Sequence, residues 1–264
     1  MACACLMDAR SIAATVRNGG KLTAATELDI EYRTLKHHFD AKIYENQVFN
    51  NFEKGDDTVE LTMGPNIADW PKMQPLTKHL LLKTAGSYHG SLTTDELLPS
   101  GEASSFRSNP ETISEYTMIS RDPDYVGRAK KIRSLETKRR EQFASGQARS
   151  VQTGDVECDA PLGTLTKTLG CQASDITFGS LMVSDKIGDG SSREQAASCQ
   201  KVLGGFANLA NEYATKRYRS NLINWGLLPL RTEEKLEIPV GSYLLVREVE
   251  QVISECKNPV KVQL

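Results

Sequence analysis

The residues best suited to chemistry form one short segment, GDGSSREQ, at positions 188–195. Its two glycines allow a sharp turn and a close approach of the backbone to a ligand. Ser191 and Ser192 stand where a helix would begin, and the free N–H groups of a helix start favour an anion. Arg193 adds a planar guanidinium that matches a carboxylate. The segment therefore predicts a site for an anionic substrate.

The flanking residues supply the elements that must position this loop. Residues 176–183 form an apolar, β-rich run that predicts a strand, and residues 193–202 are compatible with a helix. The lysine of a phosphate P-loop and the Gly-x-Ser-x-Gly of a nucleophile elbow are both missing. Taken alone, the segment could equally be an ordinary loop with a capping serine.

Three other blocks accompany the loop: LTTDELLPSG at 92–101, LGG at 203–205 and NLINWGLLPL at 221–230. With GDGSSREQAA, their order and approximate spacing resemble the swivelling domain of the aconitase superfamily. They are similar to the blocks of its bacterial-type hydratases, and the resemblance covers essentially the whole chain. Glu96 stands where that family usually has a histidine, so no role of that histidine carries over to this chain.

The resemblance implies the substrate-binding part of a 4Fe–4S hydro-lyase that acts on hydroxy di- or tricarboxylates such as citrate and isocitrate. Block matching implies that Ser191 is the catalytic base, which as an alkoxide removes a proton α to a carboxylate. A helix start and Arg193 would stabilise that charged form. The resemblance also implies that Ser192, Arg193 and Arg107 bind the substrate carboxylates.

The cysteines bear on the cofactor. Six are scattered along the chain without a C-x-x-C pair, whereas the cluster of the resembled family is held by three cysteines that include one. The resemblance therefore places the 4Fe–4S cluster in catalytic domains, or a large subunit, outside this chain, and predicts no metal ligand within it. Cys3 and Cys5 are interpreted as free thiols, and the scattered cysteines favour a reduced, cytoplasmic protein. We expect the chain alone to be inactive.

The resemblance also predicts the domain organisation of the 264 residues. Residues 1–28 are expected to be the remnant of the end of a cluster-bearing catalytic domain, residues 29–85 a linker, and residues 86–264 an aconitase-type swivel domain. The predicted fold class is α/β, a β/β/α swivel domain preceded by a helix remnant and an extended linker. That remnant favours a truncated chain over a separate small subunit.

Periodicity and turn residues predict the remaining elements. A helix is expected near residues 6–16, and others from 109–110 and over 123–146. For residues 206–225, periodicity suggests one helix, whereas the family pattern places a strand before a helix from about residue 214, and we follow the family. Strands are expected at 59–63, 79–84 and 243–246, and strands alternating with turns between 153 and 183.

Composition limits the possible partners. The net charge of −2 argues against a polyanion partner for the chain as a whole, and no apolar run is long enough to span a membrane. The segment from Arg128 to Arg140 carries seven basic residues. They are typical of a solvated helix face, or alternatively of an RNA-binding patch, although no aromatic stacking motif accompanies them. The alternative to a hydro-lyase is thus a non-catalytic anion- or RNA-binding module.

Overall fold

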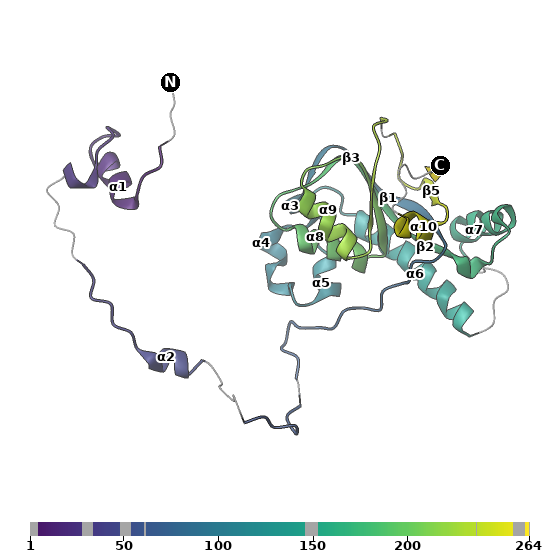
Figure 1. The fold of residues 1–264 in the computed structure, drawn as a ribbon, viewed down its shortest axis with the longest axis horizontal. Helices are drawn as coiled ribbons and strands as arrows, with labels where there is room; N and C mark the ends of the chain where they lie inside the picture. Colours follow the sequence, from purple (N-terminus) through teal and green to yellow (C-terminus); the bar gives the residue numbers. More distant parts are fainter. Residues whose placement is uncertain are drawn as a thin grey trace. The chain divides into compact units, whose positions relative to one another are not determined.

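The computed structural model describes residues 5–27, 34–47, 54–60, 62–145, 153–235, 237–255 and 262–263. The chain divides into two compact units, Met1–Glu60 and Leu61–Leu264 (Figure 1). The first unit contains α1 (Ala9–Arg17), a 3-10 turn η1 (Ala25–Glu27) and α2 (Ala41–Glu45). Asp8 caps α1 by accepting hydrogen bonds from the N–H groups of Arg10 and Ser11, which confirms the helix predicted near residues 6–16.

A six-stranded mixed sheet organises the described part of the second unit, in the order β4-β3-β2-β1-β5-β6. The first four strands in sequence are parallel, and β5 and β6 run antiparallel to their neighbours. The predicted α/β fold class is confirmed. The bounds are β1 (His79–Thr93), β2 (Ile176–Asp189), β3 (Gly205–Tyr213), β4 (Leu228–Arg231), β5 (Tyr243–Val246) and β6 (Val262–Gln263).

Helices connect these strands, and their caps are encoded locally. Asn109, Asp155 and Thr215 each accept a hydrogen bond from the first turn of the helix that they precede. The helical elements are α3 (Thr94–Leu97), α4 (Ser100–Ala103), η2 (Ser104–Phe106), α5 (Pro110–Ser114), α6 (Tyr125–Ala144), α7 (Val156–Leu169), η3 (Ala173–Asp175), α8 (Arg193–Val202), α9 (Lys216–Asn224) and α10 (Val249–Ser254).

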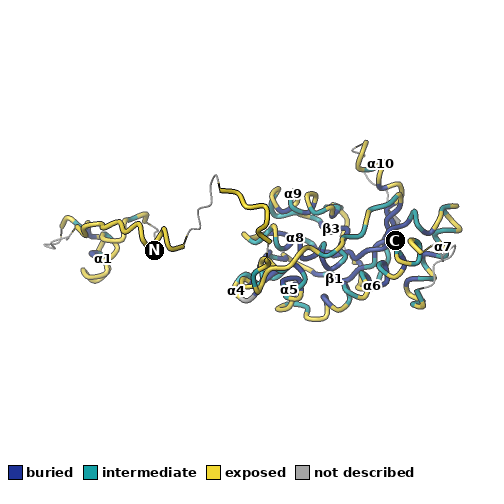
Figure 2. Tube along the Cα trace, turned by 90° about the horizontal axis from the view of Figure 1, so that it is seen from below, coloured by how far each residue is buried: buried dark blue, intermediate teal, exposed yellow. Residues whose placement is uncertain are grey.

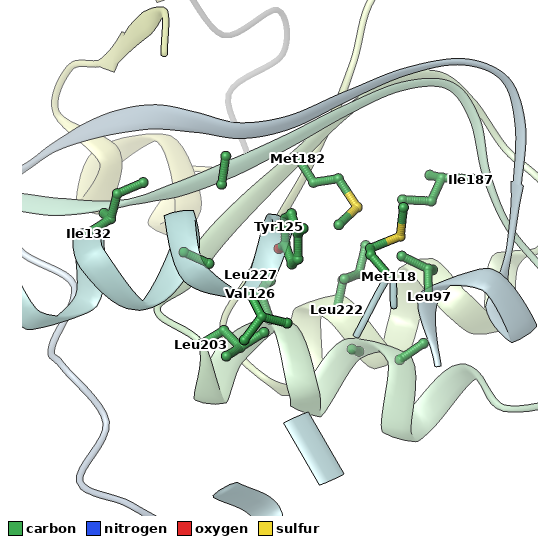
Figure 3. Packing of buried hydrophobic residues seen from close by; sticks show 14 of the residues in the cluster. Leu97, Met118, Tyr125, Val126, Ile132, Met182, Ile187, Leu203, Leu222 and Leu227 are labelled. Carbon is green, nitrogen blue, oxygen red and sulfur yellow. The ribbon is translucent and has the colours of Figure 1, made fainter. Parts of the chain in front are cut away.

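Neighbouring strand residues point to opposite sides of the sheet, and most residues of β1 and β2 are buried, so both faces of these central strands pack against a hydrophobic core. Leu81 and Met182 belong to a core shared with α6, α8 and α9, and Figure 3 shows Met182 among the side chains of that core. Leu82 and Leu181 belong to a second core, completed by residues of β5 and α10. Figure 2 shows β1 and β3 buried within the second unit.

Two predictions of strands are wrong. Val59 and Met63 are exposed and lie outside any strand, because their alternating pattern finds no partner strand to pair with. Between residues 153 and 175 the chain forms α7 and η3 instead of strands, since Asp155 begins a helix that Gly170 ends in a left-handed conformation.

Other predicted elements are confirmed, including the basic helix as α6, the helix 193–202 as α8 and the strand 243–246 as β5. The family pattern for 206–225 is correct, and the single helix suggested by periodicity is not. The strand predicted at 79–84 extends to Thr93. The domain boundaries at residues 28 and 85 stay predictions. No helix in the described ranges is both long and apolar enough to cross a membrane.

Candidate anion-binding site

Parallel pairing of β1 with β2 brings two of the sequence blocks together. Thr93 pairs with Asp189, so the block that follows β1 and the loop that follows β2 leave the same edge of the sheet. The carboxyl ends of parallel strands are where such sheets commonly build binding sites. Gly190 has a φ of +127°, and a Cβ there would lie 2.1 Å from the Thr94 hydroxyl oxygen. Only glycine fits this contact, which locks the two blocks against each other.

The other glycine of the loop, Gly188, packs against the buried ring of Tyr218. Gly188 has a φ of +90°, and a Cβ there would lie 2.1 Å from a ring carbon of Tyr218. Tyr218 is fully buried, and its hydroxyl accepts hydrogen bonds from the side-chain amides of Gln200 and Asn208, at 3.1 Å each. Burial raises the pKa of Tyr218 well above its usual value. The loop therefore turns on a neutral, braced ring.

The serines and the arginine of the loop stand at the amino end of α8. Ser192 is the residue before the helix, yet its hydroxyl makes no capping hydrogen bond. Ser191 is exposed, and within the described residues its hydroxyl has no hydrogen-bond partner. The Arg193 guanidinium donates to the Gly190 carbonyl. Both hydroxyls are thus free to meet a ligand at the positive end of the helix dipole.

Arg107 comes from a distant part of the sequence to the same place. It is exposed, follows η2 and lines a pocket of about 20 Å³ together with Ser192. The remaining lining residues are Leu98, Ser100, Ala103, Ser104, Ile113 and Gln195. Such a pocket holds about one water molecule, which is too small for a tricarboxylate. The structure brings Arg107 to Ser192 at the rim of a site that this chain does not enclose.

Glu96, which departs from the family's histidine, has a structural role here. Its carboxylate accepts hydrogen bonds from the backbone N–H and the hydroxyl of Thr93, and pairs with Arg121 at 2.8 Å. Burial raises the pKa of Glu96, but the bonds from Thr93 and Arg121 outweigh it, so the pKa is lowered overall. Glu96 therefore fastens α3 to the end of β1 as a stably charged group.

Sequence reasoning missed the surroundings of Glu194. Its carboxylate accepts hydrogen bonds from the indole Nε1 of Trp225, at 2.6 Å, and from the Asn221 side-chain amide. Glu194 belongs to the loop block and its two partners to the NLINWGLLPL block. The joint occurrence of the blocks was visible in the sequence, but their contact was not.

The described residues do not fit a 4Fe–4S cluster. Among them, no three His, Cys, Asp or Glu side chains are grouped where they could hold a metal ion. Cys158 and Cys199 are buried, and burial raises their thiol pKa to about 11 and about 12, which opposes the thiolate form that metal binding needs. Cys3 lies outside the described residues. The described residues therefore offer no set of cluster ligands.

The basic run on α6 serves the fold. Six of its seven cations make ion pairs within the chain, which leaves Lys138 without one among the described residues. Arg139 is completely buried, and its guanidinium bonds to Glu136 and to the carbonyls of Ala173 and Ile176. Cations that are already neutralised offer little to phosphates, so the structure does not favour the RNA-binding alternative.

Comparisons with known proteins found a family model and a solved structure that are similar to this chain. Residues 171–235 match the family model of the aconitase C-terminal domain. The chain is also similar to a solved 3-isopropylmalate dehydratase from Methanocaldococcus jannaschii, at 20% sequence identity over 69% of this chain and 81% of that one, with a TM-score of 0.37. No curated protein matches. The family match confirms the resemblance at the three blocks that it includes, 188–197, 203–205 and 221–230, and it spans the segment from β2 through the loop and α8 to β4. The block at 92–101 lies outside the match.

Proposed function

We propose that this chain provides the substrate-anchoring face of a hydro-lyase for hydroxy di- or tricarboxylates. The premise is that residues 171–235 match the aconitase C-terminal domain. One observation carries the proposal: Arg107 and Ser192 line the same pocket, although the sequence separates them widely. Ser191 and Arg193 flank Ser192 at the amino end of α8. Two arginines with helix N–H groups and free hydroxyls suit a ligand that carries several carboxylates.

Each loop residue has a distinct role in this proposal. Arg193 exchanges its bond to the Gly190 carbonyl for a substrate carboxylate, a better partner because it is charged. Arg107 holds a second carboxylate from the η2 side. Ser191, as an alkoxide, takes the proton from the carbon α to a carboxylate. Its negative charge is stabilised by the N–H groups at the start of α8 and by Arg193.

The proposal requires a second part of the enzyme. The pocket beside Ser192 has about 20 Å³ and is open, so it cannot exclude water from a reacting tricarboxylate. No group of three His, Cys, Asp or Glu side chains among the described residues could hold a metal ion to take the leaving hydroxyl group. We therefore propose that cluster-bearing catalytic domains or a large subunit close over this face. The chain alone then binds multi-carboxylates weakly and does not turn them over.

Citrate titration of the ¹⁵N-labelled chain, followed by NMR, tests the proposal. We expect shifts at Ser191, Ser192 and Arg193, and a loss of at least about tenfold in affinity for Arg193→Gln and Arg107→Gln, because each removes a charge-assisted bond. Lys138→Gln is the matched control. It removes one positive charge from the end of α6, where Arg139 bonds to the Ile176 carbonyl at the start of β2, and citrate affinity should stay within about twofold. Unchanged affinity in both arginine variants would refute the proposed site.

A further inference from the structure

Two aromatic residues from distant segments meet beside the candidate site. Trp70 and Trp225 are the two tryptophans of the chain. Their ring centroids lie 4.5 Å apart with an interplanar angle of 42°. Trp225 ends α9, whereas Trp70 lies in the segment before β1 and remains 52% exposed. Trp70 thus braces one face of the Trp225 indole without being buried itself.

The Trp225 indole in turn fixes a charged residue of the loop. Its Nε1–H donates to Glu194 at 2.6 Å, and Asn221 donates to the other carboxylate oxygen. Glu194 is the second residue of α8, next to Arg193. Both of its partners belong to the α9 side, whereas the pocket shared by Arg107 and Ser192 is lined by residues of α4, η2 and α5 and by Gln195 of α8. The negative charge of Glu194 is therefore turned away from that pocket.

Two attractions would draw an unrestrained Glu194 carboxylate toward the anion-binding end of α8. A carboxylate in the first turn of a helix is attracted to the free N–H groups there. An unrestrained Glu194 could also pair with the neighbouring Arg193. In either position it would occupy donors that an incoming carboxylate needs, and it would repel that carboxylate. Holding Glu194 toward α9 keeps the amino end of α8 open to anions.

We propose that Trp225, braced by Trp70, is a positioning residue of the candidate site that keeps the Glu194 carboxylate off the anion-binding end of α8. The inference rests on the proposed function for the nature of the ligand. The arrangement of Trp70, Trp225 and Glu194 is itself independent of that function and can be measured without any ligand.

The brace also couples the site to the segment before β1. The Ala68 N–H donates to the Ser108 carbonyl at 2.9 Å, beside Arg107, while Trp70 rests on Trp225. The segment thus touches the residues next to both flanks of the site. If it detaches, Trp225 loses its brace, and Glu194 gains freedom to compete with the substrate. Docking of this segment therefore favours anion binding.

Substitutions at the tryptophans separate this role from simple packing. Trp225→Phe keeps an aromatic ring but lacks the N–H, so citrate should bind about fivefold more weakly, a loss that scales with ligand charge and is near zero for acetate. Adding Glu194→Gln removes the competing charge and should restore citrate affinity to within about twofold of wild type. The citrate affinity of Trp70→Ala should lie between those of wild type and Trp225→Phe, and Trp70→Phe, which keeps an aromatic ring, is its matched control. If the double variant stays as weak as Trp225→Phe, Trp225 acts through packing and the proposal is wrong.

A second measurement needs no ligand. The chain gives two indole N–H signals in a ¹H–¹⁵N spectrum, and Trp70→Phe assigns them. We expect the Trp225 signal to lie downfield and exchange slowly, to move on Glu194→Gln and to broaden on Trp70→Ala. A Trp225 signal that exchanges like a free indole overturns the inference, whether or not citrate binds. If wild type binds no citrate, the proposed function fails, and the indole signal alone decides whether Trp225 restrains Glu194.

Discussion

A substitution at Gly190 tests the conformation of the loop directly. The Gly190 φ of +127° lies in a region that residues with a side chain rarely adopt, and an added Cβ would lie 2.1 Å from the Thr94 hydroxyl oxygen. Thr94 is 1% exposed, so its side chain has little room to withdraw. We expect Gly190→Ala to destabilise the second unit and to move the loop away from the end of β1.

The magnitude follows from two contributions. Backbone strain at such a φ costs roughly 1–3 kcal/mol. Forcing Thr94 out of its preferred side-chain angle costs a further ~0.5–1.5 kcal/mol. The expected loss is therefore about 1.5–4.5 kcal/mol, a large share of the stability of an ordinary domain, which is about 5–15 kcal/mol.

Urea unfolding monitored by tryptophan fluorescence measures this loss, since Trp70 and Trp225 both belong to the second unit. Gly163→Ala is the matched control. Gly163 lies inside α7, has no atom within 4 Å of an added Cβ and no positive φ, so this substitution should stabilise by up to about 1 kcal/mol.

A double-mutant cycle separates the two contributions. Thr94→Ala removes the clashing oxygen but not the backbone strain, so in the Gly190→Ala background it should recover about 1 kcal/mol relative to its effect in wild type. If Gly190→Ala stays within about 0.5 kcal/mol of wild type, as surface substitutions do, the loop does not adopt this conformation and the contact between the two blocks is wrong.

Three further outcomes are expected. Glu136→Gln should lower the free energy of unfolding in urea by about 3–5 kcal/mol, because it leaves the buried Arg139 guanidinium without its counter-charge. The nearby control Lys138→Gln should change it by no more than about 0.5 kcal/mol. Equal effects of the two substitutions would contradict the buried pair. Burial, with the nearby charge of Lys78, lowers the pKa of His79, and a backbone N–H donates to its Nδ1. The unfolded state therefore binds the proton more readily, and stability should fall as pH drops below about 6.5. His79→Gln should lose that part of the pH dependence, and an unchanged profile would assign it elsewhere. In an enzyme completed by its cluster-bearing part, Ser191→Ala should lower kcat by about 10²–10⁴-fold with little change in substrate affinity, and a wild-type kcat would leave Ser191 as a residue of the helix start alone.

The sequence by itself determined the features that depend on neighbouring residues. The loop glycines, the run 176–183 and the helix over 193–202 are local signals, and each was recovered in its predicted place. The order of the sequence blocks predicted the resemblance that the family model confirms for residues 171–235. Local patterns also misled: the alternation at 59–63 is that of a strand, but a strand forms only where a partner exists.

Only the tertiary structure decided which distant groups meet. Arg107 reaches Ser192, and Trp70 reaches Trp225, through parallel strand pairing and packing that no short window encodes. Charge was the clearest case: the basic run on α6 is typical of a solvated or nucleic-acid-binding face, yet six of its seven cations are neutralised within the chain. A charge is visible in the sequence, but its partner and its exposure to solvent are set by the fold, and these decide whether it remains available to a ligand.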